Sequence, residues 1–173
     1  MFTNYFIKKR IKELAREVGS RPCRSRSLDE ARSLLLFYDA EDHEAVMDLL
    51  RPLRERGMEI RTCVYVSSKG ADLPADDSTV LLREKGDLNA WGFPSDRLLE
   101  RVSSFRADLL IDITRPGRYA SQYIALRHPA SFKVGIKYPG QEWYDLCVAV
   151  TDKEDIPYLF GQILFYLRSI RAK

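Results

Sequence analysis

The sequence has few of the residues that metal and nucleotide sites require. Its 173 residues include two histidines and three cysteines, and Cys23, Cys63 and Cys147 form no Cys-x-x-Cys pair. This spacing excludes a zinc ribbon or zinc finger, so we expect no metal site. The loop after the first predicted strand has no Gly-x-Gly-x-x-Gly motif and no P-loop. We therefore also expect no cofactor.

Targeting and membrane-spanning segments are also lacking. A secretory signal has an apolar stretch of about 7–15 residues after a basic start. Here a short Phe-rich start precedes Lys8, Lys9 and Arg10. The longest uncharged stretch, residues 156–167, is shorter than the ~20 apolar residues of a membrane-spanning helix. Because the cysteine content also fits a reducing compartment, we expect a soluble, cytoplasmic protein.

The composition is that of a globular protein, with 45% hydrophobic and 31% charged residues. The net charge of +3 is unevenly distributed along the chain. Residues 1–28 contain eight basic and two acidic side chains, whereas the remainder is mildly acidic. This division predicts a basic arm over residues 1–28 and a single domain over residues 29–173.

The basic arm has the pattern of an amphipathic helix. Its apolar residues Ile7, Ile11, Leu14 and Val18 fall on one stripe, and Gly19 is a natural end. The simplest interpretation is that this stripe docks on the domain while the basic residues face solvent.

A second interpretation of the arm is a weak contact with an anionic membrane surface. Phe2, Tyr5 and Phe6 would then be the interfacial anchors. Because the aromatic residues gather at one end of the arm, membrane is favoured over nucleic acid, which we do not expect as a partner.

Strand and helix patterns alternate through the rest of the chain. Strands are predicted at residues 33–38, 59–67, 78–82, 108–113, 132–136 and 146–150, and helices at residues 45–57, 94–105, 117–127 and 155–171. This alternation is typical of βαβ units. It predicts an α/β, three-layer, Rossmann-like fold with about six mostly parallel strands and helices on both faces.

Ligands of such folds bind beyond the carboxyl ends of the strands. After the strand at 108–113, Thr114, Arg115 and Arg118 surround a predicted helix N-terminus, which suits a phosphate or carboxylate group. The alternative is that Asp112, or a carboxylate of the acidic loop after the first strand, pairs with the arginines. The sequence leaves both interpretations open.

The acidic loop after the first strand contains Asp39, Asp42 and His43. Asp39 or Asp42 is most simply the N-cap of the next helix. The alternative is a general base assisted by His43.

Two further loops follow strands. Residues 67–70 contain serines, a lysine and a glycine that would suit an anion, or form a flexible connection. Lys137, Tyr138 and Trp143 are candidates for a pocket wall.

The helix predicted over residues 155–171 is apolar on nearly all sides. A helix of this kind is buried on both sides. Either the basic arm covers its outer face, or a second copy of the chain does so in a homodimer.

Two resemblances emerge from particular segments. Residues 106–113, followed by a helix and by residues 130–136, resemble the N-terminal half of heptosyltransferase-like GT-B glycosyltransferases. The Gly-Asp pair that follows the first strand in those enzymes is replaced here by Glu41-Asp42. Their nucleotide-sugar domain also has no counterpart, so we expect no stand-alone transferase. The whole chain, including residues 87–94 and 122–126, resembles a family of small bacterial proteins without an assigned activity.

These observations favour a non-catalytic α/β module that binds a partner or a small anionic ligand. One alternative is a small enzyme or degenerate transferase half that acts on a phosphorylated or sugar substrate. Another is an adaptor that binds a membrane or nucleic acid through residues 1–28.

Overall fold

The structure, a computed structural model, describes residues 4–70, 73–149 and 155–170. Its strands form one parallel sheet in the order β3-β2-β1-β4-β5-β6. They span Ser33–Asp39 (β1), Glu59–Val66 (β2), Thr79–Arg83 (β3), Leu109–Asp112 (β4), Phe132–Lys137 (β5) and Leu146–Ala149 (β6). The predicted Rossmann-like sheet is thereby confirmed.

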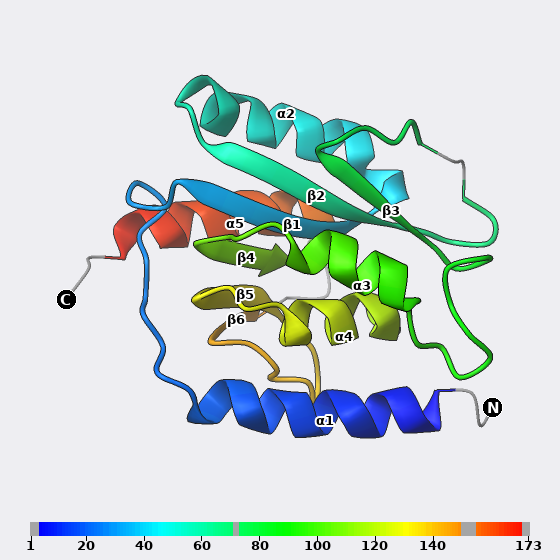
Figure 1. The fold of residues 1–173 in the computed structure, drawn as a ribbon. Helices are drawn as coiled ribbons and strands as arrows, with labels where there is room; N and C mark the ends of the chain where they lie inside the picture. The colour runs from blue at the N-terminus through cyan, green and yellow to red at the C-terminus, as the bar shows by residue number, and fades with distance from the viewer. Residues whose placement is uncertain (1–3, 71–72, 150–154, 171–173) are drawn as a thin grey trace.

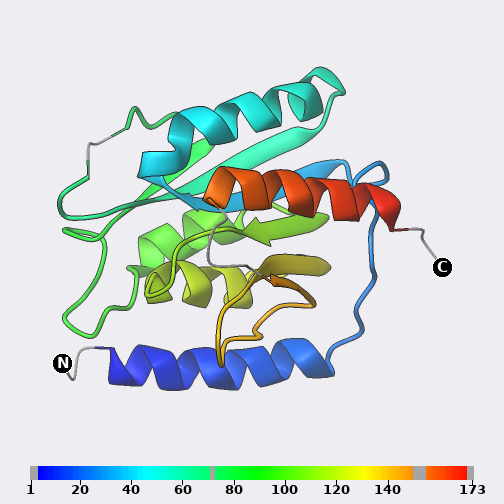
Figure 2. The same ribbon diagram turned by 180° about the vertical axis from the view of Figure 1, so that it is seen from behind.

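Helices cover both faces of this sheet (Figures 1 and 2). They span Tyr5–Ser20 (α1), His43–Glu55 (α2), Asp96–Ser103 (α3), Tyr119–Arg127 (α4) and Ile156–Ser169 (α5). The helices α2 and α5 pack on one face, and α3 and α4 pack on the other. The three predicted layers are therefore present.

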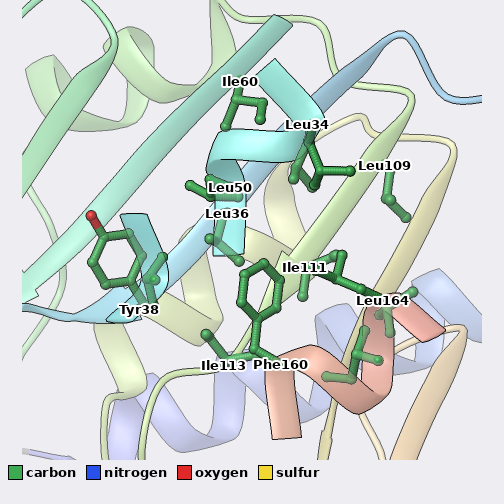
Figure 3. Close-up of a cluster of buried hydrophobic side chains, with 14 of the residues drawn as sticks. Leu34, Leu36, Tyr38, Leu50, Ile60, Leu109, Ile111, Ile113, Phe160 and Leu164 are labelled. Atoms are coloured by element: carbon green, nitrogen blue, oxygen red, sulfur yellow. The ribbon is translucent and has the colours of Figure 1, made fainter. Parts of the chain in front are cut away.

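Alternation along the strands divides the core between these two faces. Leu34, Leu36 and Tyr38 of β1 belong to the buried cluster that also contains Leu50 of α2 and Phe160 of α5 (Figure 3). The intervening residues Leu35 and Phe37 belong to the cluster under α3 and α4. Because both faces are covered, β1 is a continuous apolar run.

The basic helix α1 is docked on the domain, outside the α3 and α4 layer. Its stripe of Ile7, Ile11, Leu14 and Val18 is buried, and it packs against Tyr123 and Leu126 of α4. Figures 1 and 2 show α1 alongside α4, with the sheet beyond it. The docked interpretation of the arm is confirmed.

The connection from α1 to β1 is also tied to the domain. The guanidinium of Arg21 donates to Asp145 Oδ2 at 2.5 Å and to the carbonyl oxygen of Ser131 at 3.0 Å. Farther along, the N–H of Leu28 donates to the carbonyl oxygen of Leu167 in α5 at 3.0 Å.

The helix α5 is buried on one side only. Leu159, Phe160 and Ile163 are in the core, whereas Tyr158, Phe165 and Tyr166 are about half exposed or more. Since α1 lies on the opposite side of the sheet, the prediction that the arm covers α5 is wrong. A homodimer through residues 155–171 stays a prediction.

Candidate functional site

The candidate site lies at the carboxyl ends of β1 and β4, which are neighbours in the middle of the sheet. From β1 the chain builds outward to β2 and β3, and from β4 it builds outward to β5 and β6. The strand order therefore reverses between β1 and β4, at the place where open α/β sheets bind ligands. The acidic loop after β1 and the arginine-containing loop after β4 meet here.

Asp39, the last residue of β1, holds these two loops together. Its carboxylate accepts hydrogen bonds from the backbone N–H of Arg115 at 2.8 Å and from Nε of Arg118 at 2.7 Å. The Asp39 side chain is only 2% exposed. Two donors from the β4 loop thus satisfy a buried carboxylate, as burial of a charge requires.

Arg115 forms a bidentate salt bridge with Asp42. Its Nη1 and Nη2 lie 2.6 and 3.0 Å from the two carboxylate oxygens, and Glu41 is 3.1 Å from Nη1. Asp42 is the N-cap residue of α2, as predicted, but its side chain makes no capping hydrogen bond there, and Asp39 precedes the short turn Ala40–Asp42 instead. Pairing with the arginines is the stronger, charge-assisted interaction.

Burial alone would lower the pKa of both arginines. For Arg115, the hydrogen bond to Asp42 and the charges of nearby carboxylates outweigh burial and raise the pKa above its ordinary value. For Arg118, the hydrogen bond and charge of Asp39 do the same. Both guanidinium groups are therefore firmly cationic, and their charges are largely neutralised by the acidic loop.

Asp112 at the end of β4 has a separate set of partners. Its carboxylate accepts from the N–H of Thr114 at 2.9 Å, from the Thr114 hydroxyl at 2.6 Å, and from the Tyr144 hydroxyl. Burial raises the pKa of Asp112, although these hydrogen bonds oppose the shift. The predicted pairing with the arginines comes from the acidic loop and not from Asp112.

Tyr144 reaches Asp112 because position 135 is glycine. The Tyr144 ring lies where the Cβ of any larger residue at Gly135 would stand. The missing side chain of β5 thus makes room for a ring from the β5–β6 connection. Burial, followed by the charge of Asp112, raises the pKa of the Tyr144 hydroxyl.

A pocket of about 380 Å³ opens beside this cluster, on the side of β2. It is lined by Asp39, Ala40, Glu41, Tyr65, Ser67, Lys69, Gly70, Leu73 and Arg118. The Arg118 guanidinium lies over the Tyr65 ring at 4.5 Å. In the described part of the chain, Nε is the only Arg118 side-chain atom that donates to a carboxylate, and the rest of the guanidinium lies against Tyr65 at the edge of the pocket.

His43 is turned away from the carboxylates. Its Nδ1 is 2.8 Å from the Tyr38 hydroxyl, and the two rings are stacked. Among the described residues, no hydrogen bond or ion pair joins the His43 side chain to the carboxylate of Asp39 or Asp42. The structure therefore offers the predicted general base no assisting histidine.

The three predicted wall residues are not brought together. Lys137 pairs with Glu142 at 2.7 Å, and Tyr138 donates to the carbonyl oxygen of Thr114 at 3.1 Å. Trp143 packs against α1 and lines a different pocket, of about 230 Å³, with Lys8 and Lys12. Of the three, Tyr138 is the residue with a hydrogen bond to the described loop after β4.

Sequence reasoning missed Tyr65, Tyr144 and Gly135. Tyr65 is near the carboxyl end of β2, and that position was the available signal. The contact between Tyr144 and Gly135 joins two segments nine residues apart and has no local pattern.

Within the described residues, no group of three or more His, Cys, Asp or Glu side chains is placed to hold a metal ion.

No helix in the described part of the chain is long and apolar enough to cross a membrane.

A comparison with curated proteins found no match. The likeness to heptosyltransferase-like enzymes gains no support from this comparison and stays a prediction. A family model, described as a family of unknown function, matches residues 3–170. The chain belongs to this family, DUF6913.

Proposed function

We propose that the protein is a non-catalytic α/β module that binds a small ligand bearing an anionic group. The ligand binds in the pocket beside Arg118. The observation that carries this proposal is the orientation of Arg118. Asp39 holds its Nε, Tyr65 lies against the guanidinium at 4.5 Å, and Arg118 so fixed forms part of the pocket lining.

A fixed guanidinium is suited to a phosphate or carboxylate because its donors match two oxygens at once. Fixing the group before binding lowers the entropy lost on association. Lys69 and Ser67, which also line the pocket, would contribute a second positive charge and a hydroxyl donor. Glu41 and Asp39 limit the ligand to a small anionic group, because a large negative charge would meet their carboxylates.

The proposal that the module is non-catalytic is supported by the hydrogen bonds that the acidic loop already makes. Asp39 and Asp42 both accept from arginines, and His43 is engaged by Tyr38. A general base needs a free lone pair within reach of the substrate proton. We therefore place the enzyme that acts on a phosphorylated or sugar substrate second.

The test is a thermal-shift screen with inorganic phosphate, sugar phosphates, nucleotides, nucleotide sugars and dicarboxylates. A ligand at ~100 times its Kd adds about 2.7 kcal/mol to the free energy of unfolding, which raises Tm by several degrees. Lys69→Gln and Arg118→Lys should abolish the shift. Lys85→Gln, an exposed lysine outside the pocket, is the matched control and should retain it.

A flat screen, or a shift that survives both pocket variants, contradicts the proposed site. Lys69→Gln is the more informative variant because it leaves the pair of Asp39 and Arg118 intact. Turnover of any phosphorylated or sugar compound in the screen would overturn the non-catalytic assignment in favour of the enzyme.

A further inference from the structure

The outward face of α1 carries a row of basic side chains, and the acidic residues Glu13 and Glu17 lie to one side of this row. The apolar stripe of α1 is buried against α4, so the opposite side of the helix faces solvent. Lys9, Lys12 and Arg16 lie on this opposite side and are exposed. None of the three forms an ion pair with a described residue, whereas the neighbouring Arg10 pairs with Glu13 at 2.9 Å. Three cations without a direct ion pair among the described residues thus form a row along one helix.

Exposed aromatic rings lie at the N-terminal end of this row. Tyr5, Phe6 and Trp91 are 62%, 50% and 51% exposed. The rings of Tyr5 and Phe6 are 5.5 Å apart, and those of Phe6 and Trp91 are 5.1 Å apart, both with edge-to-face geometry. Large apolar side chains gathered on a surface commonly mark an interaction site.

Trp91 is presented by a well-defined turn. The Asn89 side chain accepts from the backbone N–H groups of Trp91 and Phe93 at 2.9 and 3.0 Å. Gly92 provides the positive φ of 82° that the turn requires, and it lies against Asn4 and Ile7 of the α1 segment. The tryptophan is therefore held out beside α1 although another part of the chain supplies it.

Between α1 and this turn runs an open groove of about 610 Å³. Its lining combines the aromatic side chains of Phe6, Trp91, Phe93 and Tyr123 with Lys9, Arg10 and Glu13 of α1. An apolar groove with basic residues beside it matches a molecule that has an apolar chain and an anionic head. This combination is the chemistry of an anionic lipid.

We infer that this face binds the surface of an anionic membrane. Lys9, Lys12 and Arg16 contact the lipid headgroups, and Tyr5, Phe6 and Trp91 enter the interface, where aromatic rings are most stable. The apolar stripe of α1 takes no part, because it is used to dock the helix on the domain. The ring cluster supplies the apolar anchor in its place.

The arrangement of the rings favours lipid over single-stranded nucleic acid. Base stacking requires open ring faces. In each edge-to-face pair here, one ring covers the face of its neighbour. Entry into a membrane interface has no such requirement, because it depends on apolar area and not on a free face.

The test is co-sedimentation of the full chain with vesicles of phosphatidylcholine alone, or with roughly one-third phosphatidylglycerol. Binding is expected only to the anionic vesicles and should weaken steeply as salt is raised. The triple variant Lys9→Gln/Lys12→Gln/Arg16→Gln should bind about 100-fold more weakly, at about five-fold for each basic residue. Arg51→Gln/Arg54→Gln/Arg56→Gln, at exposed positions in the last turns of α2 and at its C-cap, removes the same charge and should retain binding.

Tryptophan fluorescence gives an independent readout, because the chain has two tryptophans. In a Trp143→Phe variant, Trp91 is the sole reporter, and its emission should shift to shorter wavelength on anionic vesicles only. Absence of binding at low salt, equal losses in the two triple variants, or an unshifted Trp91 emission would each overturn the inference. So would binding of an RNA oligonucleotide through the same residues without vesicle binding.

Discussion

The Nε of Arg118 donates to Oδ1 of Asp39 at 2.7 Å, and this pair joins the end of β1 to the start of α4. Arg118 is the N-cap residue of α4, where a positive charge is disfavoured by the helix dipole. The carboxylate of Asp39 offsets that cost. It also fixes the guanidinium over Tyr65, so the same contact serves both the fold and the proposed anion site.

Replacement of Asp39 by Asn should destabilise the protein by about 2 kcal/mol. The backbone N–H of Arg115 and the Nε of Arg118 would both lose a charged, buried acceptor. Urea unfolding measures this change. The control is Asp48→Asn, whose partner Arg51 is exposed with it on α2, and about 0.5 kcal/mol or less is expected there. Equal effects at the two positions would show that the Asp39 cluster contributes no more than a surface ion pair.

Gly135→Ala tests the close packing of Tyr144 on β5. The new methyl group would occupy the place of the Tyr144 ring, which must move and lose its hydrogen bond to Asp112. We expect a loss of about 2–3 kcal/mol in unfolding free energy, as for other overpacked cores.

The matched control is Gly161→Ala in the middle of α5. No heavy atom lies within 4 Å of the added Cβ there, so the substitution should stabilise the helix by roughly 0.5–1 kcal/mol. Opposite signs are therefore expected for the same chemical change. A tolerated Gly135→Ala would contradict the observed position of the Tyr144 ring.

The sheet and its helices were predictable because each element has a local pattern. The continuous apolar runs of β1 and β4 indicate strands buried on both faces, and both are central in the sheet. The spacing of Ile7, Ile11, Leu14 and Val18 likewise indicated the buried face of α1. Hydrophobic periodicity records which side of an element is buried, and it does so without knowledge of the partner.

The partners within the site were not predictable in this way. The N-cap preference of Asp42 is a local tendency, but the arginine that reaches it comes from residue 115, far along the chain. The sequence presented both an acidic loop and an arginine loop and left open whether they pair. Only the adjacency of β1 and β4 settles that question, and strand order is a property of the whole fold.

The burial of Lys133 leads us to expect that the stability of the protein depends on pH. Its Nζ is buried and donates to the carbonyl oxygen of Leu126 at 2.7 Å. Burial, and secondarily the charge of Arg21, lowers the pKa of Lys133 to about 8, from its ordinary value of 10.5. Between these two values the unfolded chain binds more protons than the folded one, so the free energy of unfolding rises with pH.

The measurement is urea unfolding of the protein and of Lys133→Met across this pH window. Relative to Lys133→Met, the free energy of unfolding of the unsubstituted protein should rise by about 3 kcal/mol between pH 8 and pH 10.5. The methionine variant is the control for every other group that titrates at alkaline pH. A difference that is constant with pH would show that the Lys133 ammonium is not desolvated in the folded state.

Ile11→Ala tests whether α1 is part of the cooperative fold. Ile11 is 1% exposed in the cluster that joins α1 to α4, so its truncation leaves a cavity and should cost about 2–4 kcal/mol. Lys12→Ala, next to it on the exposed side, should change stability by less than about 0.5 kcal/mol. Urea unfolding followed by tryptophan fluorescence is informative because Trp143 packs against α1 and Trp91 lies beside it.

If α1 unfolded as a separate arm, Ile11→Ala would leave the main unfolding transition in place and add a second transition at lower urea. A single transition shifted to lower urea is expected, because the helix and the domain share one buried surface.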